Sequence, residues 1–237
     1  MTLYALVVVV LYPSFRHQTS LNNLSGSTAA ALFGITGKLT SPGGWLNANI
    51  YGNFFPLIML LLTIGYGGAA LAGQDEDGTL GLVAALPIRR RGILLQKAWA
   101  MALQAILLAA AVAVCVIIGR AFQLSISPAH TIAVSAALAL MGLDFGLITM
   151  AVGAVTGRRG TALGVGAGLA AASYLLSSLA STISGIRPAR YLSLLYWSAG
   201  SDQISRGVSA ADFAALLAVG LAALATAVAA FGRADLS

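Results

Sequence analysis

Long runs without charge constrain this chain more than any other feature. Residues 54–72 and 98–119 contain no charged side chain, and three further runs are nearly as apolar. A helix needs about 20 apolar residues to cross the roughly 30 Å hydrocarbon core of a bilayer. Five segments meet that length: Phe54–Ala72, Ala98–Gly119, Thr131–Val155, Thr161–Ile183 and Ala211–Phe231. The pattern predicts an all-α polytopic membrane protein with a single transmembrane domain over residues 1–237.

The composition supports this fold class and excludes others. Hydrophobic residues make up 59% of the chain and charged residues only 8%, too few charges for the surface of a soluble fold. The net charge of +6 is typical of membrane proteins, whose basic residues set orientation and contact anionic lipid, so no nucleic-acid partner is expected. The one cysteine, Cys115, excludes an internal disulfide, and its place within an apolar run predicts a buried thiol.

The first residues form a shorter apolar run. Met1–Tyr12 would span about 18 Å as a helix, at roughly 1.5 Å per residue, which is less than the hydrocarbon core. It lacks the basic start and the small-residue cleavage site of a signal peptide. We interpret it as the outer part of a first transmembrane helix, which makes six spans with the first incomplete as given. Residues 13–50 are then expected to form an extracellular loop.

The segment Gly73–Lys97 is the only long, densely charged stretch between two apolar spans. The acids Asp75–Asp77 precede a short apolar run, and Pro87 separates this run from the basic cluster Arg89–Arg91. The last of the acids is a suitable cap for a short helix over Thr79–Leu86, which the proline would end. A helix of about eight residues is not stable alone in water. Its apolar side therefore needs either a protein groove or the headgroups of its own bilayer.

The distribution of basic residues indicates which side of the membrane this loop occupies. Arg89–Arg91 and Lys97 cluster close to the ends of spans, and so do Arg158 and Arg159 in the short loop near residue 157. The basic residues of the opposite side are scattered along longer loops. Because the positive-inside rule acts on short loops near span ends, the Gly73–Lys97 loop is predicted to be cytoplasmic.

The residues of this loop resemble the coupling loop of ABC-2 permeases, the membrane subunits of type-2 ATP-binding-cassette transporters. The family pattern has an acidic pair, Gly-Thr-Leu, an apolar run, Pro-Val-Ser-Arg and a lysine seven residues after that arginine. Arg89 and Gln96 replace a usual serine and glycine, and Ser41–Leu46, Pro56 and Phe231–Leu236 extend the resemblance over most of the chain. The matching loop residues are Glu76, Gly78, Thr79, Leu80, Leu82, Leu86, Pro87, Arg90 and Lys97.

This resemblance implies a transport subunit and not an enzyme. In such permeases the loop forms a coupling helix that sits in a groove of a separate cytosolic ATPase, which holds ATP and magnesium. The matching loop residues would then carry the coupling, and this chain itself would hold no catalytic residue, cofactor or metal. The resemblance also implies a homodimer or a heterodimer with a second permease, in the plasma membrane of a prokaryote. Its function would be export of a small molecule, drug or lipid-like compound.

Asp144 is the one acid in the middle of a predicted span. Burial of a carboxylate at the centre of a membrane helix costs about 2.5–3.5 kcal/mol on insertion scales, so the side chain should face protein or water. A contact with a cationic substrate or a proton relay is the functional interpretation, and a hydrogen bond to a neighbouring helix is the structural one. Two other functions stay open on the residues alone: a proton-coupled secondary transporter that uses Asp144, and a non-transporting scaffold that recruits an ATPase.

Two weaker patterns concern packing. Glycines four residues apart, among them Gly142/Gly146 and Gly160/Gly164/Gly168, allow close approach of helices within the subunit or across a dimer. Tyr191–Ser198, which is rich in aromatic residues, is expected to form a short interfacial helix that anchors the chain at the membrane surface.

Overall fold

The computed structural model describes the chain except for residues 17, 19–37, 79–89, 183, 201–202 and 234–237. The secondary structure of the described residues is helical, with no strand among them. A short apolar helix, α1 (Thr2–Phe15), comes first. Five helical segments that are long and apolar enough to cross a membrane follow it: Pro42–Glu76, Arg91–Phe122, Pro128–Thr156, Arg159–Leu179 and Ala210–Gly232. The predicted all-α polytopic fold is confirmed.

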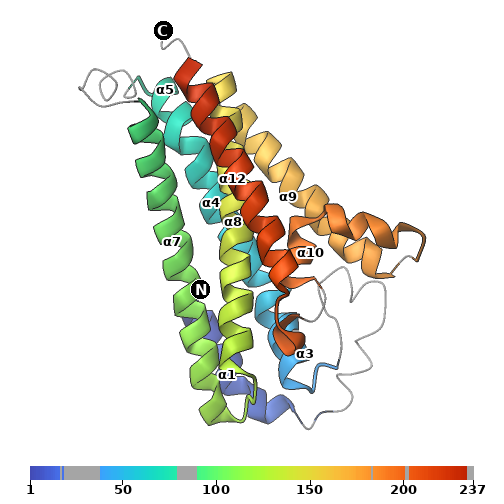
Figure 1. The fold of residues 1–237 in the computed structure, drawn as a ribbon. Coiled ribbons are helices and arrows are strands. Elements are labelled where there is room, and N and C mark those ends of the chain that lie inside the picture. Colours follow the sequence, from blue (N-terminus) through green and yellow to red (C-terminus); the bar gives the residue numbers. More distant parts are fainter. Residues whose placement is uncertain (17, 19–37, 79–89, 183, 201–202, 234–237) are drawn as a thin grey trace.

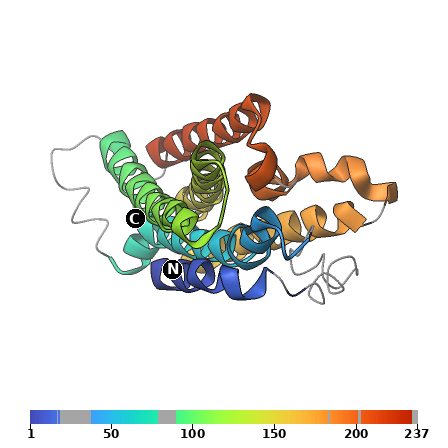
Figure 2. The same cartoon turned by 90° about the horizontal axis from the view of Figure 1, so that it is seen from below.

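The central helix of the bundle is α8 (Pro128–Thr156), the most deeply buried of the five membrane-crossing segments. The long helices that pack against it are α4 (Phe54–Gly68), α7 (Arg90–Ile118), α9 (Arg159–Thr182) and α12 (Ala210–Arg233). Figure 1 shows α12 and α7 running beside α8, and Figure 2 shows α1 on the outside of the bundle. Since α12 is the least buried of the crossing segments, most of its surface is free to meet lipid or another chain.

Glycines on α8 explain how closely its neighbours approach. A Cβ atom at Gly146 would lie 2.5 Å from Met101 Sδ of α7 and 2.9 Å from the carbonyl oxygen of Thr63 of α4. A Cβ atom at Gly142 would collide with the side chain of Met59, also on α4. A larger side chain at Gly146 would therefore push against the backbone of α4, and one at Gly142 would require the Met59 side chain to move. The close approach expected at Gly142/Gly146 therefore occurs within the subunit.

The glycines of α9 divide between two faces. A Cβ atom at Gly166 would collide with the hydroxyl of Thr149, so this face of α9 packs tightly on α8. By contrast, no described atom lies within 4 Å of a Cβ atom built at Gly160, Gly164 or Gly168. The helix thus turns one glycine face to the bundle and leaves the other face open.

Aromatic side chains hold together the end of the bundle opposite the Gly73–Lys97 loop, the lower end in Figure 1. Trp45 Nε1 donates a hydrogen bond to the carbonyl oxygen of Val8 at 3.0 Å. The hydroxyl groups of Tyr12 and Tyr4 donate to the carbonyl oxygens of Thr40 and Asn49, at 3.1 and 3.0 Å. These bonds fix α1 to α3 (Pro42–Leu46) and to the π-helix η2 (Asn47–Tyr51).

Helical structure begins before the expected span Phe54–Ala72. Ser41 Oγ accepts a hydrogen bond from the Gly44 N–H at 3.1 Å, and Pro42 is the first residue of α3. A capping serine followed by proline is a favourable start for a helix, although hydropathy alone assigns glycine and proline here to a loop. Residues 42–50 are therefore helical parts of the expected loop 13–50, and so are residues 13–15 at the end of α1.

The sequence predicted one short helix over Tyr191–Ser198. In the structure, the chain beyond α9 forms two short elements instead. A 3₁₀ helix, η5 (Ser184–Leu192), is followed by α10 (Leu194–Ala199). Ser193 lies between them, and its Oγ accepts a hydrogen bond from the Tyr196 N–H at 3.3 Å, which caps α10. The guanidinium of Arg190 stacks on the rings of Tyr191 and Tyr196, 4.9 and 5.0 Å from their centroids, and so joins the two elements.

Candidate functional site

The segment Gly73–Lys97 leaves the bundle where α5 (Gln74–Glu76) faces the first turns of α7, at the upper end in Figure 1. A π-helix, η3 (Ala69–Gly73), connects α4 to α5 without a break. Lys97 Nζ donates a hydrogen bond to Gln74 Oε1 at 2.6 Å, and both side chains are partly buried. This hydrogen bond closes the base of the segment between the two residues.

The first end of this loop packs against the turn between α8 and α9. Glu76 Oε1 accepts a hydrogen bond from the backbone N–H of Arg159 at 2.9 Å, at the residue where α9 begins. Arg159 Cδ lies 3.4 Å from the position of a Cβ atom at Gly73. Asp75 Oδ2 lies 3.5 Å from the corresponding position at Gly157, which ends α8 with a left-handed φ of 63°. The acidic cluster thus faces this turn of its own chain.

Four of the nine loop residues singled out from the sequence are described, and each has a distinct position. Glu76 binds the start of α9, and Lys97 closes the loop. Gly78 has a φ of 69°, in the left-handed region that favours glycine. Arg90 is the first residue of α7 and is described by its backbone alone. The residues that lie outside the described part are Thr79, Leu80, Leu82, Leu86 and Pro87, so the short helix and its cap stay predictions.

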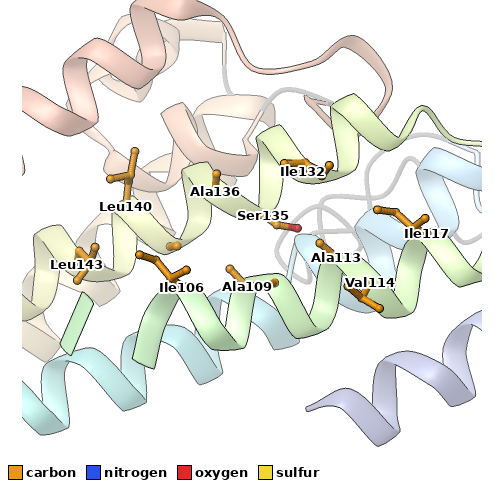
Figure 3. A pocket seen from close by; sticks show the side chains of 12 residues that line it. Ile106, Ala109, Ala113, Val114, Ile117, Ile132, Ser135, Ala136, Leu140 and Leu143 are labelled. Atoms are coloured by element: carbon orange, nitrogen blue, oxygen red, sulfur yellow. The ribbon is translucent and has the colours of Figure 1, made fainter. Parts of the chain in front are cut away.

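An apolar cleft of about 510 Å³ opens between α7 and α8. Figure 3 shows its walls, with Ile106 on α7 opposite Leu140 and Leu143 on α8. Among the described residues that line it, Ser135 is the one with a polar side chain. Its Oγ shares a hydrogen bond of 3.0 Å with the hydroxyl of Tyr51. The cleft suits the apolar part of a lipid or of a lipid-like compound.

A second apolar cleft, of about 590 Å³, lies between α4 and α9. Leu57 and Leu61 of α4 face Leu175 of α9 across it. The hydroxyl of Tyr174, also in the lining, donates a hydrogen bond to Asn53 Oδ1 at 3.2 Å. Because Asn53 precedes α4, this polar pair lies at the end of the cleft that is distant from the Gly73–Lys97 loop.

Asp144 lies near the middle of α8 and is only 1% exposed. Its Oδ1 is 2.5 Å from the position that a Cβ atom of Gly220 would occupy, so the carboxyl group faces α12. Within the part of the chain that the structure describes, Oδ2 has no hydrogen-bond partner. The carboxyl group is therefore accommodated by the missing side chain of a glycine, and the expected hydrogen bond to a neighbouring helix is not seen at this oxygen.

Metal-binding side chains do not gather in the described residues, where no three His, Cys, Asp or Glu form a group that could hold an ion. His130 lies beside Gly207, with its Cδ2 3.2 Å from the Cβ position of that glycine. Cys115 is buried, with its Sγ 3.9 Å from the carbonyl oxygen of Thr2. Neither side chain contributes to the loop or to the two clefts.

Comparison with models of protein families identifies the family of this chain. The model of the ABC-2 family transporter protein matches residues 1–236. The chain belongs to the ABC-2 transporter family. It is therefore the membrane permease of an ABC transporter, a multi-pass transport subunit and not a catalytic one. A comparison with curated proteins gave no match.

Sequence reasoning missed the part of this ABC-2 permease that receives the acidic cluster. The turn at Gly157 lies far along the chain, and Arg159 follows Glu76 by 83 residues. The sequence offered one indication of this contact. The basic pair Arg158-Arg159 lies at the end of a span, on the same predicted side of the membrane as the acids. Only the packing shows that the backbone N–H of Arg159 is the donor to Glu76.

Proposed function

We propose that this ABC-2 permease exports a small molecule, drug or lipid-like compound, driven by a separate cytosolic ATPase that binds the Gly73–Lys97 loop. Two permease chains, either two copies of this chain or this chain with a second permease, would assemble with two ATPase subunits. The complex would lie in the plasma membrane of a prokaryote, with ATP and magnesium held by the ATPase.

The observation that carries this proposal is the closure and anchoring of the loop. A loop that transmits force must be attached firmly to the helices that it moves, since a loose loop would absorb the displacement. Lys97 and Gln74 join its two ends, and Glu76 attaches it to the start of α9. A movement of the bound ATPase would thus reach α5, α7 and α9 together, as rigid-body coupling between two states requires.

The cleft between α4 and α9 is our candidate for part of the transport path. Its lining is almost wholly apolar, which suits a hydrophobic compound, and a polar pair at Tyr174 and Asn53 lies at the end away from the ATPase side. Both of its walls connect directly to the loop, because α4 continues into α5 and α9 begins at the residue that Glu76 binds. Export is the direction that the resemblance to ABC-2 permeases implies.

The test is co-purification of the permease with an ABC ATPase encoded by a neighbouring gene and expressed in the same cells. Wild type is compared with Leu82→Asp/Leu86→Asp, which places charge on the predicted apolar side of the coupling helix. Gln123→Asp is the matched control, since Gln123 is exposed at the opposite end of the bundle. Size-exclusion profiles show that each variant is inserted and folded.

We expect the ATPase to be recovered with wild type and with Gln123→Asp but not with the double leucine variant. Equal recovery with all three proteins would show that the loop is not the binding surface. Failure of wild type to retain the ATPase would contradict the proposed function itself.

A further inference from the structure

A hydrogen bond next to the Gly73–Lys97 loop connects α9 to the helical segment that contains α4. Since α4, η3 and α5 follow one another without a break, Glu76 is the last residue of a helical segment that includes α4. Its Oε1 accepts the backbone N–H of Arg159, the first residue of α9, at 2.9 Å. We call this hydrogen bond the α5–α9 link.

The chemistry of the α5–α9 link is that of a helix cap supplied by another element. The first N–H groups of a helix have no partner inside the helix, and the helix dipole favours negative charge at this end. Arg158 directly precedes α9 and its carbonyl oxygen accepts the Ala162 N–H at 3.1 Å, but an arginine side chain cannot accept a hydrogen bond. The carboxylate of Glu76 fills the role that a capping side chain within the same segment would have.

Neighbouring contacts place this cap firmly. The aliphatic part of the Arg159 side chain lies against Gly73, and the carboxylate of Asp75 lies beside Gly157 in the same turn. Asp77 is exposed, as Glu76 is, and its backbone N–H bonds to the Gly73 carbonyl oxygen within its own segment at 3.0 Å. Of these three acids, Glu76 is thus the one whose side chain bonds directly to α9.

We propose that the α5–α9 link transmits movement of the ATPase-bound loop to α9, and so moves one wall of the α4–α9 cleft. This inference rests on the proposed function and assigns Glu76 a role within the permease instead of on the ATPase surface. Displacement of α5 pulls the start of α9 through a charge-assisted hydrogen bond, and α9 tilts about its close contact with α8 at Gly166, so that its far end moves relative to α4. Without the link, α5 moves with the ATPase and α9 does not follow.

The hydrogen bond can be removed from either side, and each removal has a matched control. Glu76→Ala removes the acceptor, and Asp77→Ala removes a neighbouring exposed acid that lies outside the link. Arg159→Pro removes the donor, because proline has no N–H and is well tolerated at the first position of a helix. Arg159→Ala removes the same side chain but keeps the N–H.

The readout is the distance across the cleft in the purified permease–ATPase complex. Spin labels are attached at Leu61→Cys on α4 and Leu175→Cys on α9, which line the cleft and are 75% and 51% exposed. The background is Cys115→Ala, which removes the one native cysteine. An excess of unlabelled permease keeps label pairs within one chain. Pulsed electron paramagnetic resonance then compares the nucleotide-free complex with the complex trapped in magnesium ATP.

We expect magnesium ATP to shift the label distance in wild type, Asp77→Ala and Arg159→Ala. Glu76→Ala and Arg159→Pro should both lose that shift while they still retain the ATPase. A wild-type shift in these two variants would overturn the inference, and so would a wild-type complex whose label distance does not respond to ATP. Loss of the ATPase from Glu76→Ala but not from Arg159→Pro would place Glu76 on the ATPase surface and leave the proposed function intact. A wild-type permease that binds no ATPase would overturn both.

Discussion

At the scale of single residues, Asp144 is the one acid among the buried side chains of the described residues. A buried polar group without a hydrogen bond lowers stability, and Oδ2 of this carboxyl has no partner among the described residues. The space that it occupies exists because residue 220 of α12 is a glycine. Asp144 and Gly220 are therefore in direct contact between α8 and α12. The effect of substituting one of them on stability should depend on the side chain at the other.

Gly220→Ala should lower the melting temperature of the detergent-purified permease, because its Cβ atom would lie 2.5 Å from Asp144 Oδ1. Overpacking of this kind costs about 1–3 kcal/mol. Adding Asp144→Ala to that variant removes the clashing oxygen and should recover most of the loss, so the two changes are not additive. Gly168→Ala is the control, since its Cβ atom meets open space. Equal melting temperatures for Gly220→Ala and Gly168→Ala would contradict the assigned contact.

A second prediction at this scale concerns Ser193, which is fully buried between η5 and α10. Its hydroxyl accepts the Tyr196 N–H at 3.3 Å and donates to the carbonyl oxygen of Ser173 on α9 at 2.7 Å. Ser193→Ala removes a helix cap and leaves buried groups unpaired, which should destabilise the protein by about 1–2 kcal/mol. Thermal unfolding measures this loss, with the exposed Ser125→Ala as the control. A variant as stable as that control would show that α10 does not depend on its cap.

At the scale of helices, the glycine patterns show what spacing can and cannot predict. Gly142/Gly146 on α8 and Gly164/Gly168 on α9 have the same four-residue spacing, so the sequence predicts the same close approach for both. In the structure the first pair meets Met59, Met101 and Thr63, whereas the second pair meets nothing within 4 Å. The spacing identifies a surface that can pack closely, but the partner is decided by the arrangement of the whole bundle.

Alanine substitution separates these two kinds of glycine. Gly146→Ala should reduce the melting temperature and the yield of folded permease, because its Cβ atom would lie 2.5 Å from Met101 Sδ and 2.9 Å from a backbone oxygen of α4. Gly164→Ala should leave both unchanged or slightly improved, since alanine also favours the helix by about 1 kcal/mol over glycine. Thermal unfolding and recovery after size exclusion measure the difference. A loss at Gly164 as large as that at Gly146 would mean that the open face of α9 is covered by another chain.

The contrast between local sequence patterns and tertiary packing also explains how much of the fold could be predicted from the sequence. Long apolar runs predicted the all-α class and five crossing segments, because a bilayer imposes a length and a polarity on each helix. The early start at Pro42 was not predicted, since its cap and proline also fit a loop. The break at Ser193 depends on buried partners of α9, and the bond of Glu76 to Arg159 joins residues 83 apart. Such contacts depend on tertiary packing, which local sequence patterns do not contain.

At the scale of the whole molecule, the two ends of the bundle differ in chemistry. One end gathers the acidic cluster, the start of α7 and the basic α8–α9 turn, and the Gly73–Lys97 loop leaves from it (Figure 1). The opposite end is closed by α1, α3 and η2 through bonds from tryptophan and tyrosine side chains. In a permease driven by a cytosolic ATPase, the end that carries the acidic cluster must face the cytoplasm. A measurement of the orientation therefore also tests the coupling proposal.

This orientation can be measured with single cysteines in the Cys115→Ala background, which contains no other thiol. Asp77→Cys reports the loop end and Gln123→Cys the opposite end, and both positions are exposed. Neither change removes a basic residue, so the charges that set orientation are kept. In intact cells a membrane-impermeant maleimide should label Gln123→Cys at once and Asp77→Cys only after permeabilisation, whereas the parent stays unlabelled throughout. The reverse order would place the acidic cluster and the α5–α9 link outside the cell, where no ATPase could reach them, and would exclude the coupling mechanism.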